Sequence, residues 1–265
     1  MKILHVNKGY NLLGGVEKYV KEAVEYQRNA GHYVDVLAIS PNNKKNIETS
    51  NKGCIYEYPL LYEYSSARFS LSFFYNFFRK IRKYEVVHLH FPNPLGELAF
   101  LLLPKIKIPK TIVTFHNEVS SDKPFSKQYN IFAKLFLKKV DRIIVTSPNI
   151  INSTPILKEN INKIRINPLG IRINKVQSFN KINTKKSDNY ILFVGRLSSV
   201  KGLEYLIEAM KNVNCKLVIA GDGPLRPKLL NLIKELKIES KVDLLGYVDN
   251  GELVKLYANA DIFIL

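Results

Sequence analysis

The chain has 265 residues, 46% of them hydrophobic, which is enough to bury the cores of two domains and excludes a globally disordered protein. Lys and Arg (40) outnumber Asp and Glu (23), so the formal net charge is +17, and a surface of this sign either attracts anionic lipid, nucleic acid or phosphorylated substrates or simply stays well solvated. The two cysteines, Cys54 and Cys215, lie far apart, which excludes a disulfide framework and a cysteine metal site and fits a reducing compartment.

Segments typical of strands and helices alternate along the first half of the chain. Apolar and β-branched runs predict strands buried on both faces, as in a parallel sheet, and a helix over Val16–Ala30 follows the first run and ends before Gly31. This alternation predicts an α/β domain over residues 1–173. Its strands are expected at Lys2–Asn7, Tyr33–Ile39, Val86–His90, Thr111–His116 and Arg142–Thr146.

A second α/β series follows a stretch rich in Lys, Asn and Ser at residues 174–189, which we interpret as a linker. The series predicts a second domain over residues 190–265. Four strands are expected in it, where a doubly wound domain normally has about six, so we expect this domain to be incomplete. The strands are predicted at Tyr190–Val194, Lys216–Ala220, Val242–Leu245 and Asp261–Leu265, and the helices at Leu203–Lys211, Pro224–Leu236 and Gly251–Ala258.

A glycine and two cations follow the strand predicted at 190–194. Gly195 lets the backbone approach a ligand, and the helix expected to begin near Gly202 presents unpaired N–H groups. Arg196 and Lys201 supply positive charge beside them. This arrangement predicts a binding site for a diphosphate.

Gly14 and Gly15 follow the first predicted strand and precede its helix. They permit close approach of the backbone to a ligand at the carboxyl edge of the sheet, although a flexible turn is an equally good interpretation. They do not form the G-x-G-x-x-G pattern, so the sequence does not support a nicotinamide cofactor.

His88 and His90 are two residues apart on a predicted strand and face the same side of it. A metal pair is one interpretation, but no third ligand has convincing spacing, and hydrogen-bonded packing residues are the usual alternative. His90 and His116 each end a predicted strand, where ligands of open α/β sheets bind, and Glu118 follows two residues later. We expect His116 to contact a ligand, and for His90 and Glu118 a packing or surface role is the alternative.

Two further loops end strands of the second domain. In Gly221-Asp222-Gly223-Pro224 the glycines permit positive φ and the proline suits the first position of a helix, so this turn is expected mainly to shape a cleft. Gly246-Tyr247-Val248 ends the next strand, where backbone amides are predicted to face a nucleobase.

Two aromatic and basic segments of the first domain bear on partners. In residues 68–83, Phe69, Phe73, Phe77 and Ile81 recur every four residues, and residues 123–140 repeat the pattern. Such basic amphipathic helices suit an anionic membrane surface, or their aromatic stripes pack on the core and their cations are solvated. The cations expected to face a membrane are Arg79, Arg82, Lys83, Lys127 and Lys134.

Taken together, these residues resemble family-4 retaining glycosyltransferases of the GT-B type. The resemblance covers essentially the whole chain. It implies two Rossmann-like domains facing each other across a cleft, a nucleotide-diphosphate sugar bound mainly by the second domain, and no essential metal or other cofactor. The motifs that carry it are Gly14-Gly15, His90 with Pro92-Asn93-Pro94, His116, Asn167-Pro168-Leu169-Gly170, Gly195-Arg196 with Lys201-Gly202, Gly221-Asp222-Gly223-Pro224, Gly246-Tyr247-Val248 and Leu253–Leu265.

The resemblance also implies roles for individual residues. Arg196 and Lys201 bind the diphosphate and stabilise charge on the leaving group, and His116 is the catalytic residue near the transferred sugar. Further donor-binding residues are Gly195, Gly223, Tyr247 and Val248, and the acceptor or phosphate loop comprises Gly14, Gly15, His90 and Glu118.

The sequence departs from this family after the strand that ends at Leu265. Family members continue into a turn with a serine and then two glutamates, eight positions apart, that hold the sugar and ribose of the donor. Those residues are missing, so we expect a C-terminally truncated chain with weak or no transferase activity.

The resemblance implies retaining transfer of a hexose, for which mannose is one candidate, from a nucleotide sugar to a lipid-linked or polysaccharide acceptor in bacterial surface glycan synthesis. The alternative is a non-catalytic fragment that binds acceptor lipid or a partner chain. Nucleic-acid binding rests on charge alone and is not expected. We expect a cytoplasmic protein, peripheral to the inner face of the plasma membrane, and the sequence leaves its oligomeric state open.

Overall fold

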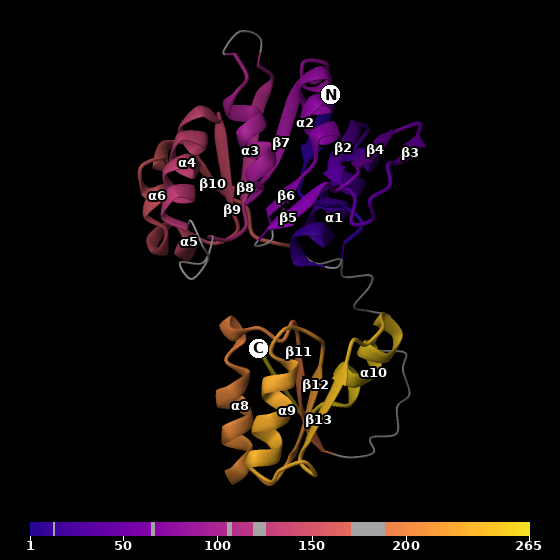
Figure 1. The fold of residues 1–265 in the computed structure, drawn as a ribbon, viewed down its shortest axis with the longest axis vertical. Helices are drawn as coiled ribbons and strands as arrows, with labels where there is room; N and C mark the ends of the chain where they lie inside the picture. The colour runs from indigo at the N-terminus through magenta and orange to yellow at the C-terminus, as the bar shows by residue number, and fades with distance from the viewer. Residues whose placement is uncertain (13, 65–66, 105–107, 119–125, 171–188) are drawn as a thin grey trace. The chain divides into compact units, whose positions relative to one another are not determined.

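The computed structural model describes residues 1–12, 14–64, 67–104, 108–118, 126–170 and 189–265. The chain divides into two compact units, Met1–Leu169 and Gly170–Leu265 (Figure 1). Except for Asn189, the predicted linker lies outside the described residues and stays a prediction.

An eight-stranded sheet forms the centre of the first unit. Its strands are β1 (Lys2–Val6), β2 (Tyr33–Ile39), β3 (Asn46–Ser50), β4 (Gly53–Tyr58), β7 (Val86–Phe91), β8 (Lys110–Phe115), β9 (Arg142–Val145) and β10 (Ile164–Ile166). They lie in the order β10-β9-β8-β7-β1-β2-β4-β3. All neighbours pair in parallel except β3 and β4, so the carboxyl ends of the parallel strands share one edge. The strands β5 (Tyr62–Tyr64) and β6 (Ala67–Phe69) pair in a separate antiparallel two-stranded sheet.

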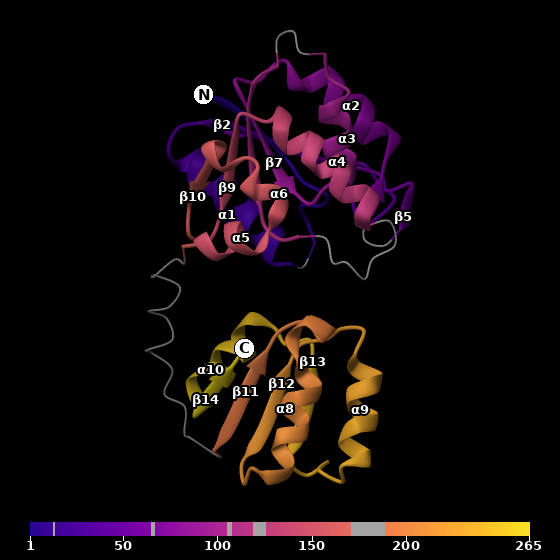
Figure 2. The same ribbon diagram turned by 90° about the vertical axis from the view of Figure 1, so that its left-hand side faces the viewer.

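Helices cover both faces of this sheet. The helices are α1 (Gly15–Asn29), α2 (Leu71–Ile81), α3 (Pro94–Leu101), α4 (Ser126–Lys139), α5 (Pro148–Ser153) and α6 (Pro155–Lys158), and the 3-10 turn η1 spans Ile161–Lys163. Phe73 of α2, Phe100 of α3 and Phe136 of α4 are fully buried in the largest core cluster, on one face (Figure 2). On the other face, Val20 and Val24 of α1 pack in a cluster with residues of β2 and β4.

Packing decides the direction of the aromatic stripe on α2. Ser70 caps the helix by accepting a hydrogen bond from the backbone N–H of Phe73 (3.2 Å). Phe73, Phe77 and Ile81 then point into the core, because their spacing of four residues places them on one face. Phe69 belongs to β6 and is 40% exposed. Of the two interpretations of this stripe, core packing is therefore confirmed for Phe73, Phe77 and Ile81, and contact of these three side chains with a membrane is ruled out.

The second unit is a four-stranded parallel sheet in the order β13-β12-β11-β14. Its elements are β11 (Tyr190–Val194), η3 (Ser199–Lys201), α8 (Leu203–Ala209), η4 (Met210–Asn212), β12 (Lys216–Ala220), α9 (Arg226–Glu235), β13 (Val242–Gly246), α10 (Asn250–Asn259) and β14 (Ile262–Ile264). Ile207 of α8 and Ile233 of α9 are buried against one face, whereas Leu256 of α10 packs with Leu192 and Val218 on the other (Figure 1). The predicted α/β class is confirmed in both units. None of the described helices combines the length and apolar composition that a membrane span requires.

The strand pair β3 and β4 is absent from the sequence prediction. The residues Asn46–Ser50 are mostly polar and exposed, so they have the pattern of a loop. They form a strand because Thr49 and Ser50 pair in antiparallel register with Cys54 and Gly53 of β4. Tertiary pairing therefore overrides a weak local signal.

Glu97 is a buried carboxyl group within the core of the first unit, on α3. It accepts hydrogen bonds from the backbone N–H of Asn93 (2.7 Å) and from the hydroxyl of Tyr129 on α4 (2.8 Å). Burial nevertheless raises the pKa of Glu97 to about 7, because desolvation outweighs these two bonds. The folded protein therefore binds this proton more tightly than the unfolded chain does.

The Glu97→Gln substitution should change the pH dependence of folding. In the wild type, the proton bound to Glu97 stabilises the fold fully below pH 4.5, the pKa of this group in the unfolded chain. This stabilisation is lost as pH rises through about 7, so the free energy of unfolding falls by an amount on the order of 3 kcal/mol. The free energy of unfolding of the variant, measured in urea relative to the wild type, should therefore rise by about this amount between pH 4.5 and pH 8. The exposed-site variant Glu85→Gln is the control, and an equal difference for Glu97→Gln at both pH values would contradict the assignment.

Candidate functional site

The candidate site of the first unit lies at the carboxyl edge of β1, β7 and β8, which are neighbours in the sheet. The chain leaves β1 toward β2 on one side and returns to β7 on the other, so the order of strands reverses between β1 and β7. Gly14 is the N-cap of α1 and Gly15 its first residue, and both are exposed. A side chain at Gly14 would meet the carboxylate of Glu17, 2.2 Å from the position of its Cβ.

The predicted histidines occupy the face of the sheet that α1 covers. His90 is 1% exposed, and its Nδ1 lies 3.2 Å from Nε2 of His116, which is half-buried at the end of β8. The ring of Tyr19 on α1 stands edge-on to both imidazoles, with centroids 5.9 Å and 5.1 Å away. The structure therefore brings together His90 and His116 beneath one aromatic ring of α1.

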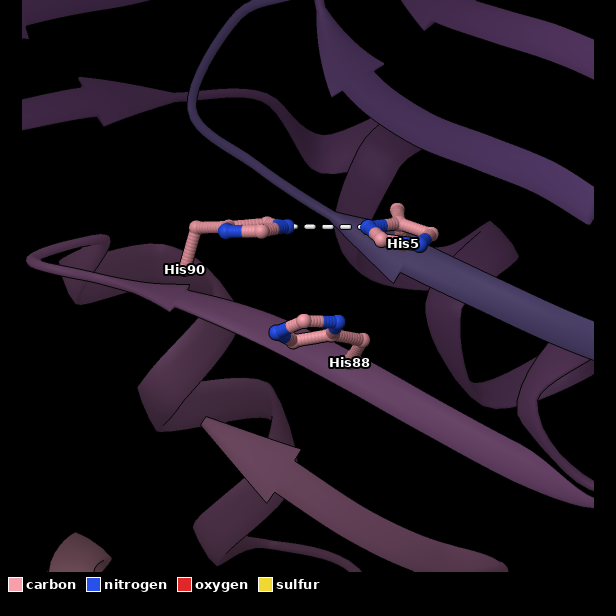
Figure 3. A group of neighbouring side chains, drawn as sticks. All are labelled: His5, His88 and His90. Carbon is pink, nitrogen blue, oxygen red and sulfur yellow. Dashed lines mark hydrogen bonds between the residues drawn. The ribbon is translucent and has the colours of Figure 1, made fainter. Parts of the chain in front are cut away.

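Sequence reasoning missed His5. It lies on β1 directly beside His88 of β7 and is fully buried. Its Nδ1 is 2.9 Å from Nε2 of His90, as Figure 3 shows, and its Nε2 is 2.8 Å from Oε1 of Gln27 on α1. The pairing of β1 with β7 brings this third imidazole to the pair, and no pattern within either strand encodes that pairing.

The three imidazoles His5, His88 and His90 include ligand atoms that all lie within 4.8 Å of one another, which is close enough to hold a metal ion. In the structure the ring nitrogens have other partners. His5 and His90 bond to each other, and Nε2 of His88 lies 2.7 Å from the hydroxyl of Thr114. The arrangement is therefore a hydrogen-bonded network as it stands.

Burial keeps these imidazoles neutral. It lowers the pKa of His5 to about 4, and that of His116 to about 4 with a smaller contribution from Lys8. Burial also lowers the pKa of His88 and His90 well below the usual value, and the neighbouring histidines add to this effect. At neutral pH each ring therefore has one N–H donor and one acceptor nitrogen.

Glu118 is exposed two residues beyond His116. Within the described residues, its backbone carbonyl accepts a 3.4 Å hydrogen bond from the side chain of Asn117, and its carboxylate has no hydrogen bond or ion pair. The structure places it at the same edge of the sheet as His116.

In the second unit, three loops at the carboxyl edge are joined through their backbones. Gly221 N–H donates to the carbonyl of Gly246 (2.7 Å), and Leu197 N–H donates to the carbonyl of Asp222 (3.0 Å). Gly221 has φ +140°, and a Cβ there would lie 1.9 Å from the carbonyl oxygen of Gly195. A Cβ at Gly223 would lie 2.4 Å from the carbonyl oxygen of Leu197. Only glycine therefore permits this close approach of the loops.

Arg196 and Lys201 project from the first of these loops and are both exposed. Across the described part of the chain, neither forms an ion pair with a carboxylate. Lys201 ends the turn η3, and Gly202 adopts the left-handed conformation (φ +62°) before α8 begins. Because α8 has seven residues, the two cations and the loop amides, more than the helix dipole, supply the positive potential.

The other donor-binding residues predicted in the second unit lie nearby in the fold. Tyr247 is 69% exposed and follows Gly246, and Val248 is half-buried beside it. Sequence reasoning missed Arg226, in the first turn of α9. Its Nη2 donates to the carbonyl of Leu244 (3.2 Å), whereas its buried Nη1 has no hydrogen-bond partner within the described residues. The signal available for Arg226 was a cation two residues after the Gly-Pro turn.

The cations predicted to face a membrane have unequal surroundings. Arg79 and Lys83 line a surface cavity of about 230 Å³ with Lys45 and Lys80, against the aromatic rings of Tyr56 and Tyr58 and the amide of Asn76. Arg82 and Lys127 are exposed. Lys134 forms an ion pair with Glu159 (2.6 Å), which reduces the charge it presents to a surface. Of these predicted cations, Arg79 and Lys83 are therefore the two that share a cavity with other cations.

Two family models match the chain. Glycosyltransferase Family 4 matches residues 13–175, and Glycosyl transferases group 1 matches residues 174–265. Among curated relatives, O-antigen chain mannosyltransferase C from Escherichia coli is 30% identical over 86% of this chain and 63% of its own length. D-rhamnosyltransferase WbpZ from Pseudomonas aeruginosa is 28% identical over 97% of this chain and 68% of its own. The chain thus spans about two thirds of the length of these relatives.

The solved structure of Anabaena Alr3699/HepE, in complex with UDP and glucose, superimposes on 99% of this chain and 73% of its own with a TM-score of 0.70 at 15% identity. This likeness confirms the predicted GT-B type of α/β fold. Since one family model covers well over half of the residues, the chain belongs to glycosyltransferase family 4.

Proposed function

We propose that the second unit binds a nucleotide-diphosphate sugar and that the protein transfers its hexose to a lipid-linked or polysaccharide acceptor in bacterial surface glycan synthesis. The observation that carries the proposal is the pair of exposed cations, Arg196 and Lys201, on a loop held by contacts that only glycine permits. The names of the mannosyltransferase and rhamnosyltransferase relatives support the class of reaction, and the former favours mannose.

The largest change in charge during the proposed transfer is on the leaving group. As the bond between the sugar C1 and the diphosphate oxygen breaks, negative charge builds on the diphosphate, and Arg196 and Lys201 are placed to stabilise it. Two fixed cations perform the neutralisation that a divalent ion performs elsewhere, so we propose transfer without a metal or other cofactor. Retention, with attack from the face that the leaving group vacates, is the stereochemistry proposed from the family.

We assign the first unit to the acceptor and to the transferred sugar. The neutral imidazole of His116 is suited to a hydrogen bond with a sugar hydroxyl, and we propose that it is the catalytic residue of this unit. Gly14 and Gly15 expose backbone at the same sheet edge as Glu118, and we propose that these three residues form the acceptor or phosphate loop. His90 is buried, so its proposed part in this site is indirect, through its contact with His116. Tyr247 and Val248 are proposed to contact the nucleobase.

Neutralising either of the two cations should weaken diphosphate binding. Each charge-assisted hydrogen bond is worth about 1.5 to 3 kcal/mol, so Arg196→Gln and Lys201→Gln should each weaken the affinity for UDP or GDP at least about tenfold. Isothermal titration calorimetry of the full chain with both nucleotides measures the effect and identifies the preferred base. Lys234→Gln is the matched control, because Lys234 lies at the far end of α9 from the joined loops. Unchanged affinity in both loop variants would overturn the proposal.

Transfer itself is tested with nucleotide sugars and a lipid-pyrophosphate acceptor. We expect the weak transfer that the sequence predicts, and we expect an excess of chelator to leave it unchanged. His116→Ala should lower it at least about tenfold, since the sugar loses a hydrogen-bond partner. Binding of nucleotide without any transfer would instead support the non-catalytic alternative. A loss of activity in chelator would contradict the metal-independent mechanism.

We further propose that the first unit docks on an anionic membrane surface through α2, at the inner face of the plasma membrane. Lys45, Arg79, Lys80 and Lys83 surround one cavity whose lining includes no acidic residue, a charge pattern that suits a phosphate headgroup. The buried aromatic stripe contributes nothing to this contact. The attraction is therefore electrostatic, with Leu71 and Tyr75 as the exposed apolar side chains of the helix.

Charge reversal on α2 should release the protein from anionic vesicles. Each cation near such a surface is worth about 1 kcal/mol, so the triple variant Arg79→Glu, Arg82→Glu, Lys83→Glu should lose binding at least about 100-fold. Flotation with phosphatidylglycerol vesicles, compared with phosphatidylcholine vesicles, measures this. The control variant Lys211→Glu, Lys234→Glu, Lys255→Glu makes the same change in net charge on exposed lysines of the second unit. Equal loss in both variants, or binding to neutral vesicles, would contradict docking through α2.

A further inference from the structure

A chain of four polar side chains runs through the first unit from α1 to the end of β8. Oε1 of Gln27 lies 2.8 Å from Nε2 of His5, and Nδ1 of His5 lies 2.9 Å from Nε2 of His90. Nδ1 of His90 then lies 3.2 Å from Nε2 of His116. Figure 3 shows the central contact, in which the rings of His5 and His90 meet edge to edge.

The amide oxygen of Gln27, at one end of this hydrogen-bonded series, determines which ring nitrogen of each histidine carries the proton. A neutral imidazole has one N–H, and an amide oxygen only accepts. Nε2 of His5 must therefore donate to Gln27, which leaves Nδ1 of His5 as an acceptor for the N–H of His90. The same step repeats once more, so His90 accepts at Nδ1 from Nε2–H of His116. The lone pair of His116 is thereby placed on its Nδ1.

The surroundings of the chain favour neutral rings. The ring of His88 stacks on that of His90 and lies tilted against that of His5, with centroids 4.5 Å and 4.7 Å away. His88 bonds to Thr114 instead of joining this series of hydrogen bonds. The charged groups that act on the chain are cations, Arg28 on His5 and Lys8 on His116, and both oppose a second proton. No carboxylate is among the hydrogen-bond partners and electrostatic neighbours recorded for these three rings in the described part of the protein.

We propose that Gln27, His5 and His90 are positioning residues that hold His116 as the Nε2–H tautomer and so present its Nδ1 as a hydrogen-bond acceptor at the edge of the sheet. The ligand of that acceptor, a hydroxyl group of the bound sugar, rests on the function proposed above. The tautomer itself does not, because it follows from contacts within the first unit alone.

Two substitutions of Gln27 distinguish its role in fixing the proton order from a role in packing alone. Gln27→Glu keeps an oxygen acceptor, so the proton order should persist. Gln27→Met removes the acceptor at similar volume, and the chain then avoids an unpaired buried N–H on His5 by reversing its proton order. His116 should shift toward the Nδ1–H tautomer in the Met variant only.

The measurement is the ring nitrogen spectrum of the full chain labelled with ¹⁵N-histidine, at pH 7 and without ligand. Among the five histidines, single substitutions assign the signals, and backbone amide spectra show that each variant is folded. The proposal requires Nε2–H tautomers for His5, His90 and His116 in the wild type and in Gln27→Glu. An Nδ1–H tautomer of His116 in the wild type, or an identical tautomer in Gln27→Met, would overturn it.

A metal-binding role for the same rings gives a different result. If His5, His88 and His90 bound Zn²⁺, a stoichiometric amount of the ion added to the protein would shift the signals of all three rings together. The ion would also break the hydrogen bond between His5 and His90, so this result would overturn the proposal. If the tautomers are as expected but transfer activity does not fall in Gln27→Met, the proposed proton order is correct and the role assigned to His116 in transfer is wrong. A fall of about tenfold in kcat/KM in Gln27→Met, with kcat/KM unchanged in Gln27→Glu, would support both the proton order and the role of His116.

Discussion

Parallel strand pairing is the constraint on which both candidate sites depend. When β1 lies beside β7, or β11 beside β12, the carboxyl ends of the two strands must meet at one edge. The loops that leave this edge are then close in space although they are far apart in the sequence. In the second unit the backbone bonds between the Gly195, Gly221 and Gly246 loops result directly from that register, and the first unit places His90 and His116 by the same means.

The sequence predicts what local pattern controls. Tyr33–Ile39, Tyr190–Val194 and Lys216–Ala220 are strands with the predicted bounds, because apolar runs of this length between turn signals have few other uses. The turn at Gly202 that precedes α8 was likewise predictable, because glycine suits its left-handed conformation, whereas the diphosphate site at Arg196 and Lys201 stays a prediction. What could not be predicted depends on pairing between distant segments. His5 joins the histidine network only through the register of β1 with β7, and β3 is a strand only through β4.

A second feature that the sequence does not determine is the direction in which a helix face points. The period of four in the aromatic residues of α2 predicts a helix, but periodicity does not say whether the stripe meets a core or a membrane. Packing against the sheet answers this question for Phe73 and Phe77. The unpredicted burial of Glu97 has the same origin, because its partner Tyr129 comes from another helix.

The polar strand β3 has a consequence for how the protein behaves at high concentration. A parallel sheet that ended at β4 would offer the backbone groups of a buried strand to any other chain. Instead β3 runs antiparallel along that edge and presents Asn46, Glu48, Thr49 and Ser50, with Ile47 as its single apolar side chain. An intermolecular sheet extended from this edge would have to bury a carboxylate and several polar side chains. The strand that sequence patterns treat as a loop therefore disfavours edge-to-edge aggregation at this edge of the eight-stranded sheet.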